Sequence, residues 1–522
     1  MRKIKTQGTK AECSILAGGA LLLFAMSLFA EGTTTPINLS LTSDISIFEK
    51  PRVIGFDLGL ISAESKGVWG LQFALLNTKV EGNMYGFQIA PSFPLVSISW
   101  SEEEPDWACV TKGNVYGGQL SLLTRSITYG KFYGAQFNGF SFDSRVIGDF
   151  YGVQAGLFTN RVGVEPSDLD FKKGLIFEED SNENPADFYG IQFSALLGNK
   201  VTGNFCGIQS GTLLRNYIKG DLIGIQLGGL TLNTVEENCY GIQASAFANR
   251  TKRNAGILQI AGIANFTERN TYGLQVSGLA NMTKKTCYGA QLGGFNGAET
   301  LNGIQLGLLG GGGKNIRGIQ ISGLGNGADN IRGIQIGGLG NGARNIRGIQ
   351  ISAIANVVDN FRGIQLGAIN YAKKDSYGFQ GGLFNNSHAD FRGLQIGVIA
   401  TGADKLRGVQ LGGITFVKKD FYGLQAGLLN VAGDSCGVQL AAGGNVGDYF
   451  CGLQIGVMGN KMRKISGIQI GAVNITEHVR GAQIGIFNIC RTLRGIQIGL
   501  INKASDNFLK YMPILNVGWY EE

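Results

Sequence analysis

The side chains best suited to binding chemistry in this chain are arginines that return at one position of a repeated motif. A guanidinium group donates paired hydrogen bonds to sulfate, phosphate or carboxylate groups. If copies of the motif stack on one another, these side chains form a basic row for an anionic glycan such as lipopolysaccharide. The row comprises Arg317, Arg332, Arg347, Arg362, Arg392 and Arg407, and Tyr377 and Tyr422 interrupt it.

A competing interpretation is that nearby acids neutralise this row and keep the surface soluble. The acids in question are Asp329, Asp359, Asp390 and Asp404. Earlier copies of the motif carry tyrosine where the later ones carry arginine, so the two halves of the chain are expected to present different surfaces. These tyrosines are Tyr85, Tyr116, Tyr133, Tyr151, Tyr189, Tyr240, Tyr272 and Tyr288.

Residues for catalysis are scarce. His388 and His478 are the only histidines, and they are far apart in sequence. A histidine triad or a multi-histidine metal site is therefore not expected. The glycine run before Lys314 fails the phosphate-loop pattern, because Leu308 stands where the first glycine is needed and Asn315 follows the lysine. We therefore expect no enzymatic activity, no cofactor and no metal site.

Two acidic clusters and the cysteines leave alternatives open. Calcium binding competes with plain solvated loop charge for the clusters Glu102, Glu103, Glu104 and Asp106, and Glu178, Glu179 and Asp180. Cys436 and Cys451 precede the motif glycine in successive copies, so stacking would place them roughly 4.8 Å apart. A disulfide is possible at that spacing, but two buried thiols are the favoured interpretation.

The element that must position all these residues is a repeat of about 15 residues. Its most regular copies place glutamine, in a G-x-Q core, at Gln305, Gln320, Gln335, Gln350, Gln365, Gln380, Gln395, Gln410 and Gln425. The register extends back to Gln72 and forward to Gln497, with Asp57 in the glutamine slot of one further copy before Gln72. Such self-similarity indicates one short supersecondary unit built over and over.

Each unit predicts a short β-strand followed by turns. Counting the glutamine as zero, aliphatic residues stand at −4, −1, +1 and +4, glycine at −2, and asparagine at +5 or +6. Apolar residues make up 44% of the chain and charged residues 16%, so a packed core is expected rather than disorder. Fifteen residues leave no room for an ordinary helix beside the strand, and the 83 glycines of the chain argue against one.

Two all-β architectures fit these units. In a parallel β-solenoid with about 15-residue coils, identical residues stack into ladders, with isoleucine inside and the amides of glutamine and asparagine bonding along the axis. About 26 to 28 such coils are expected. The alternative is a large outer-membrane up-and-down β-barrel, in which antiparallel neighbours gain no ladder from exact repetition. We favour the solenoid.

The sequence divides into four parts. Residues 1–30, basic and then apolar up to Ala30, are typical of a signal peptide, with an uncleaved anchor as the alternative. Residues 31–51 are expected to form a linker or cap, 52–504 the repeat domain with insertions near 91–113 and 161–187, and 505–522 a C-terminal cap. No later segment is long and apolar enough for a transmembrane helix.

The repeats also resemble a known family. GIQLGAIN, GIQIGAVN, GAQIGIFN and GIQIGLIN are similar to the G-[LIV]-Q-[LIV]-G-x-[ILVF]-N motif of bacterial surface-repeat proteins of Leptospira and related spirochaetes. The ending NFLKYMPILN looks like the close of that group, and the likeness covers roughly residues 52–519. It implies an exported protein of the cell surface or outer membrane and brings no known catalytic residues.

Together these features predict an exported, non-enzymatic protein with a structural or adhesive role at the bacterial cell surface. An outer-membrane channel is the alternative if the chain forms a barrel, and a secreted carbohydrate-active β-helix is a third hypothesis. Expected partners are an anionic glycan, lipopolysaccharide or a host surface component, with outer-membrane association possible. The net charge of +7 is too mild to call for nucleic acid.

Overall fold

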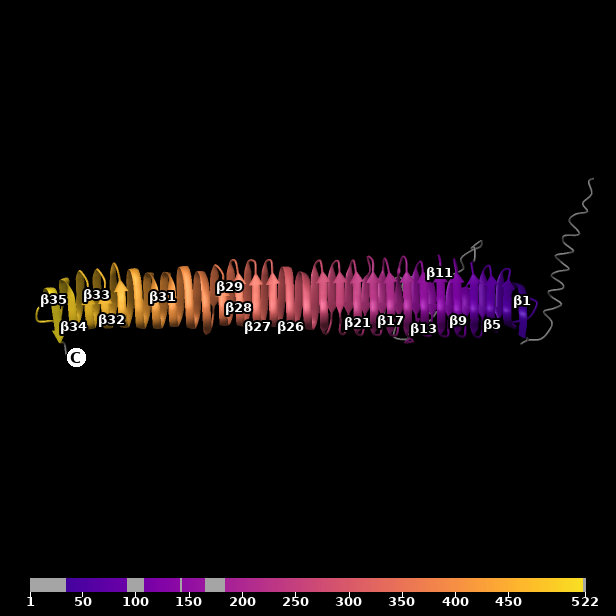
Figure 1. The fold of residues 1–522 in the computed structure, drawn as a ribbon, viewed down its shortest axis with the longest axis horizontal. Helices are drawn as coiled ribbons and strands as arrows, with labels where there is room; N and C mark the ends of the chain where they lie inside the picture. The colour runs from indigo at the N-terminus through magenta and orange to yellow at the C-terminus, as the bar shows by residue number, and fades with distance from the viewer. Residues whose placement is uncertain (1–33, 92–107, 141–142, 165–183, 520–522) are drawn as a thin grey trace, which may run out of the picture. The chain divides into compact units, whose positions relative to one another are not determined.

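The protein is a parallel β-solenoid. The computed structural model describes residues 34–91, 108–140, 143–164 and 184–519, and every element in these ranges is a β-strand. Strands of one turn pair in parallel with those of the next, over about 27 turns (Figure 1). This pairing confirms the solenoid and shows that the up-and-down barrel alternative is wrong. The predicted signal peptide and both acidic clusters lie outside the described residues.

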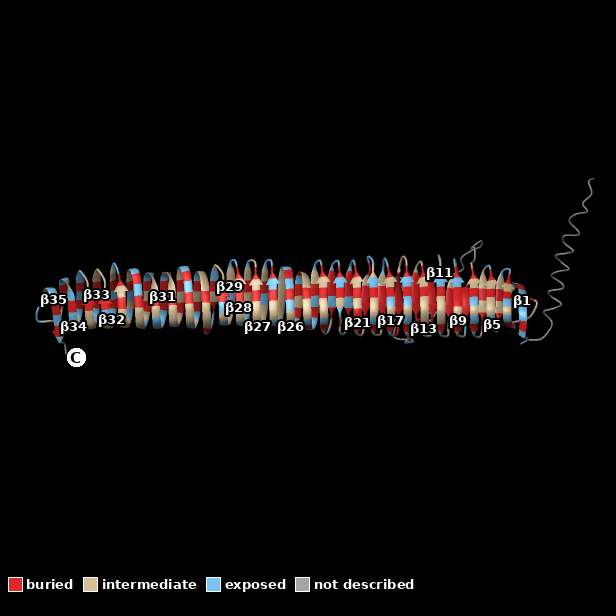
Figure 2. Ribbon diagram, viewed as in Figure 1, coloured by how far each residue is buried: buried red, intermediate tan, exposed pale blue. Residues whose placement is uncertain are grey.

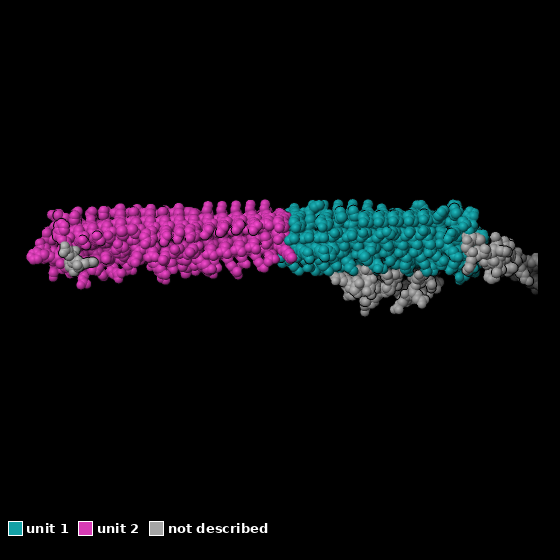
Figure 3. Space-filling view, turned by 90° about the horizontal axis from the view of Figure 1, so that it is seen from below, with its two compact units in different colours: residues 1–284 teal, residues 285–522 magenta. Residues whose placement is uncertain are grey.

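The chain divides into two compact units, residues 1–284 and 285–522 (Figure 3). In most turns of the first unit a principal strand with the motif is followed by a short strand of four residues. The principal strands are β1 (Thr34–Thr42), β3 (Arg52–Gly59), β5 (Gly67–Ala74), β7 (Met84–Ala90), β9 (Val115–Ser121), β11 (Phe132–Asn138), β13 (Phe150–Gly156), β15 (Phe188–Ser194), β17 (Phe205–Gly211), β19 (Leu222–Gly228), β21 (Cys239–Ser245), β23 (Leu258–Ala261) and β25 (Thr271–Ser277).

The short strands form a second parallel row. They are β4 (Ser62–Ser65), β6 (Asn77–Val80), β8 (Ala108–Thr111), β10 (Arg125–Thr128), β12 (Asp143–Val146), β14 (Thr159–Val162), β16 (Gly198–Val201), β18 (Arg215–Ile218), β20 (Leu232–Val235), β22 (Ala248–Thr251) and β24 (Ala264–Thr267). At the beginning, β2 (Ile45–Ser46) folds back antiparallel onto β1, and β1 pairs in parallel with β3. Residues 34–42 therefore form a strand of the stack within the predicted linker or cap.

In the second unit the extended backbone often continues around the corners of the coil, so some strands are long. They are β26 (Ala280–Ser322), which begins in the first unit, β27 (Gly325–Gly337), β28 (Gly340–Ser352), β29 (Ala355–Leu366), β30 (Ile369–Ala372), β31 (Ser376–Gly456), β32 (Gly459–Ile470), β33 (Val473–Ile484), β34 (Phe487–Ala504) and β35 (Tyr511–Trp519). β35 reverses direction and pairs antiparallel with β34, so it covers the backbone edge of the last coil.

The motif glutamines form the centre of the core, from Gln72 to Gln497 (Figure 2). In both units each Nε2 donates to Oε1 of the glutamine one turn earlier, as Gln335 does to Gln320 at 3.0 Å and Gln350 does to Gln335 at 2.9 Å. The sequence spacing of such pairs is 15 in this region and 18 between Gln136 and Gln154. The predicted amide ladder along the axis is therefore confirmed.

The prediction that isoleucine lies inside is confirmed at −4 and wrong at −1 and +1. The buried side chains stand at −4, 0 and +2, as Ile316, Gln320 and Ser322 do. Side chains alternate along a strand, so a buried glutamine forces its two neighbours outward. Ile304 and Ile321 accordingly keep 40% and 36% of their surface exposed.

An acid terminates the glutamine ladder at its start. Gln72 Nε2 donates to Asp57 Oδ2 at 2.9 Å, and Asp57 also accepts bonds from Asn38 and Ser65. Because every amide in the row points its N–H end toward the N-terminus, the row presents donors there, and a carboxylate accepts them. At the other end, the amide of Asn516 from β35 donates to Gln497 Oε1 at 3.0 Å.

A second buried amide ladder runs in the opposite direction. In it Asn Nδ2 donates to the asparagine one turn later, as Asn341 does to Asn356 at 3.1 Å and Asn474 does to Asn488 at 2.8 Å. The same nitrogen also donates to a backbone carbonyl, for example from Asn341 to Ile351 at 2.6 Å. Both hydrogens of the amide are thus used, which removes the penalty of burying it.

Apolar rows complete the core on either side of the amides. In the first unit Phe132, Phe150, Phe188 and Phe205 stack at −4 with ring centroids 4.8–5.0 Å apart. In the second unit the same row contains isoleucine, leucine and phenylalanine. The spacing of the rings is that of neighbouring strands, so the parallel register itself produces the stacking.

Close contact between coils favours glycine at −2, and Ile257, two residues before Gln259, is the exception, with φ of +28°. Gly333 has φ of +145°, a conformation that residues with a Cβ rarely adopt, and a Cβ there would lie 2.0 Å from the carbonyl oxygen of Gly318. Gly342, in the same coil, has open space around the position of a Cβ and no positive φ. The two glycines therefore differ in structural role.

Replacing Gly333 with alanine is expected to lower the free energy of unfolding by at least about 2 kcal/mol, because the change adds backbone strain and a clash with the preceding coil. Gly342→Ala should change it by less than about 1 kcal/mol, with the sign toward stability. Urea unfolding followed by circular dichroism measures both. Equal stability of the two variants would contradict the proposed packing of the coils.

Candidate ligand-binding groove

Stacking of the coils aligns the predicted arginine row. Arg317, Arg332, Arg347 and Arg362 pair one with the next in the parallel register, and Arg362 pairs with Tyr377. All six predicted arginines are exposed, including Arg392 and Arg407. Their position, −3, lies next to the buried −4 residue, and the alternation of the strand turns it outward.

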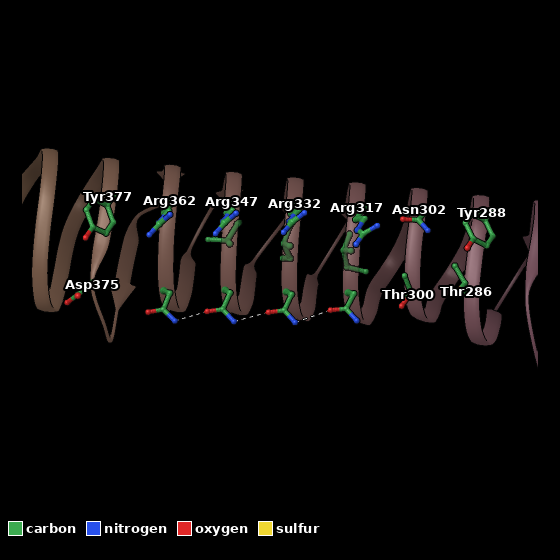
Figure 4. A pocket seen from close by; sticks show the side chains of 17 residues that line it. Thr286, Tyr288, Thr300, Asn302, Arg317, Arg332, Arg347, Arg362, Asp375 and Tyr377 are labelled. Atoms are coloured by element: carbon green, nitrogen blue, oxygen red, sulfur yellow. Dashed lines mark hydrogen bonds between the residues drawn. The ribbon is translucent and has the colours of Figure 1, made fainter.

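Four of these arginines line a groove of about 840 Å³ in the second unit (Figure 4). A row of asparagines at −5 lies parallel to them along the groove, made of Asn315, Asn330, Asn345 and Asn360. Thr286 and Tyr288 line one end, and Asp375 and Tyr377 the other. Arg392 and Arg407 do not line this groove, so the structure brings together four of the six predicted residues.

The asparagines bond to one another along the groove. Each Nδ2 donates to the asparagine one turn earlier, at 2.9 Å from Asn330, 2.8 Å from Asn345 and 2.6 Å from Asn360. An amide nitrogen carries two hydrogens, and each of these donors uses one of them in the row. The second hydrogen remains available, so the groove offers amide donors beside guanidinium donors.

Two of the acids that were expected to neutralise the row form ion pairs with other cations instead. Asp329 forms an ion pair with Arg344 at 3.3 Å, and Asp359 with Lys373 at 3.7 Å. No ion pair in the described residues involves the four arginines of the groove. At the strand spacing of about 4.8 Å, neighbouring like charges repel by about 1 kcal/mol even in water, so a bound anion relieves this repulsion.

Tyr377 extends the basic row past the end of the groove. The guanidinium of Arg362 lies 5.2 Å from its ring centroid and that of Arg392 lies 5.3 Å away, on neighbouring coils. Such contacts hold two cations against an aromatic face without an acid. The tyrosine therefore continues the row rather than breaking it.

In the first unit the same position forms an aromatic ladder. The rings of Tyr85, Tyr116, Tyr133, Tyr151 and Tyr189 stack with centroids 4.8–5.0 Å apart. This confirms that the two halves of the chain present different residues at −3, tyrosine first and arginine later. Uncharged stacked rings carry no mutual repulsion, so they give no comparable reason for an anion to bind.

The other candidates do not assemble into a reactive site. Lys314 of the glycine run pairs with Glu299 at 2.7 Å, His388 lies against the ring of Tyr371, and His478 bonds to Thr492 at 2.8 Å. Within the described ranges no three His, Cys, Asp or Glu residues lie close enough to hold a metal. The same ranges contain no helix long and apolar enough to span a membrane.

The cysteines of the described chain are all free. Cys109, Cys239, Cys287 and Cys490 lie in the core, and burial raises the pKa of each thiol to about 12. Cys436 and Cys451 are neighbours, as predicted, but only half-buried. A hydrogen bond to Cys451 raises the pKa of the Cys436 thiol.

Sequence reasoning missed the asparagine row of the groove. Its signal is present in the sequence, because each of the four arginines is preceded two residues earlier by asparagine, as Arg332 is by Asn330. Searches among protein-family models, curated proteins and solved structures find no significant match to this chain. The resemblance to spirochaete surface-repeat proteins therefore stays a prediction.

The thiols give a direct test of which residues face the core. In the folded protein a thiol reagent should modify Cys206, Cys436 and Cys451, because the thiolate reacts and these side chains are partly exposed. The four core thiols should react at least about a hundredfold more slowly until the protein unfolds. Mass spectrometry of modified peptides reads this out, and uniform modification of the folded protein would contradict the assigned core.

Proposed function

We propose that this protein is an exported, non-enzymatic binding protein of the bacterial cell surface whose arginine groove holds a linear anionic glycan. The observation that carries the proposal is the set of four exposed guanidinium groups, one per coil, without an acidic partner in the described chain. The predicted signal peptide and the resemblance to surface-repeat proteins support the location. A groove that holds such a polymer suits an adhesive or structural role.

The groove favours a polymer over a small anion. Its donors repeat with every coil, so a chain with regularly spaced sulfate or phosphate groups engages several guanidinium groups at once. Each exposed contact contributes little alone, about 0.5–1 kcal/mol, and several together give useful affinity. Sulfated polysaccharide and the phosphorylated sugars of lipopolysaccharide share this chemistry.

Binding of heparin to the mature chain, measured by calorimetry, tests the proposal. The double variant Arg332→Gln with Arg347→Gln should bind about five- to thirtyfold more weakly, because two guanidinium contacts of about 0.5–1 kcal/mol each are lost. Binding of the parent protein should weaken as salt is raised. Purified lipopolysaccharide, as a second probe, separates the two sources of anionic sugar.

The matched control is Lys418→Gln with Lys419→Gln, which removes the same charge from exposed residues outside the groove. It should bind heparin as the parent does. An equal loss in both double variants would mean that net charge attracts the glycan without the groove. Failure of the parent protein to bind either probe would refute the proposed function.

A further inference from the structure

Every coil of the second unit has a charge-free half. From −2 to +5, no Asp, Glu, Lys or Arg occurs in any repeat from 303–310 to 495–502. The charged residues of these coils, including the arginine row, stand in the remaining part of the repeat. Because the coils stack in register, the charge-free halves join into one continuous surface, which we call the apolar face.

Exposed apolar side chains cover this face. The row at +4 alone contributes Leu324, Leu339, Ile354, Ile369, Phe384, Ile399, Ile414, Leu429, Met458, Phe487 and Ile501, each exposed. Rows at −1 and +1 add further residues, such as Ile304 and Ile498. The burial of glutamine in the core is what turns these side chains outward.

The face is too large for an ordinary protein surface. Fourteen coils at about 4.8 Å give a length of roughly 65 Å, and a width of roughly 15 Å gives on the order of 1,000 Å². The largest apolar patch of a typical monomer measures about 300–600 Å². A standard interface buries about 800 Å² per partner, so this face has the area of a stable dimer interface.

Near the C-terminal end the face carries a groove of about 640 Å³. Its floor is the glycine at +2, as in Gly471, Gly485 and Gly499, and its walls are the aliphatic rows at +1 and +3. The wall at +3 includes Val457, Ile486 and Leu500, and Leu500 keeps 68% of its surface exposed. A ridge and a groove of the same period therefore lie side by side on one surface.

We propose that the apolar face of the second unit docks onto the same face of a second copy of this chain. The groove accepts an aliphatic ridge that repeats with the spacing of the coils, and a second copy supplies such a ridge. In a two-fold arrangement each ridge enters the partner's groove, which is the self-complementarity that symmetric dimers require. Identical side chains then interdigitate in a dry interface.

A lipid surface fits the face less well. It has no period to match the ridges, and the second unit has no tryptophan on this face, since Trp519 of β35 is its only one. Aromatic residues at the level of the headgroups are typical of membrane-bound surfaces. Lipid is therefore treated as an alternative outcome of the experiment.

Light scattering and sedimentation of the mature chain, at concentrations from about 1 to 50 μM, test the proposal. The parent protein should have twice the mass of one chain. The triple variant Val457→Glu, Ile486→Glu and Leu500→Glu should have the mass of one chain, because each carboxylate would lose its water in the interface. Lys418→Gln, Lys419→Gln and Lys464→Gln change the net charge by the same amount, and this control should stay dimeric.

Circular dichroism checks that the triple variant is folded. If it is unfolded, the single variant Leu500→Glu takes its place, and its dimer should be at least about tenfold weaker than that of the parent protein. A monomeric parent protein overturns the proposal, and so does a triple variant that stays dimeric. Cosedimentation of a monomeric parent with phosphatidylcholine or phosphatidylglycerol vesicles would assign the face to lipid. The triple variant leaves the arginine groove unchanged, so it should still bind heparin. The test of the dimer is therefore separate from the test of the proposed function.

Discussion

The rest of the structure depends on hydrogen bonding between buried glutamine side chains. A buried primary amide needs a partner for its N–H groups and its oxygen, and in each unit the neighbouring coil supplies an identical one at 2.6–3.0 Å. If the register shifted by one residue, each glutamine amide would lie beside the aliphatic residue at −1 or +1 of the neighbouring coil. The amide would then have no hydrogen-bond partner. The amide row therefore fixes which strands are parallel, which residues face inward and how far each coil is offset from the last.

The other features follow from that constraint. Alternation places aliphatic residues outward beside each glutamine, and close contact of the coils favours glycine at −2, where φ is near +140°. The same stacking carries each surface residue from coil to coil, so that one arginine per repeat becomes a groove and one leucine per repeat becomes a ridge. Both proposed partners, an anionic polymer and a second copy of the chain, would be recognised because their groups repeat with the spacing of the coils.

Much of this could be predicted from the sequence. The regular return of glutamine predicted the parallel coils and the amide ladder. Asp57, which occupies the glutamine position of an earlier copy, was correctly placed at the start of that ladder. The inward direction of Ile319 and Ile321 was predicted wrongly, because alternation alone does not say which face is buried, and hydrophobicity suggested the wrong one. The pairing of Asp329 with Arg344 rather than with the arginine row could also have been predicted, because both stand at −6 in successive repeats and stacking places them side by side.

Replacement of Gln335 with leucine tests the buried amide row most directly. The change leaves Oε1 of Gln320 without its donor and Nε2 of Gln350 without its acceptor, while adding an apolar side chain of similar size. The account predicts that urea unfolding shows a loss of about 2–6 kcal/mol in the free energy of unfolding, since each of the two orphaned polar groups costs about 1–3 kcal/mol. A variant as stable as the parent protein, or more stable, would contradict it.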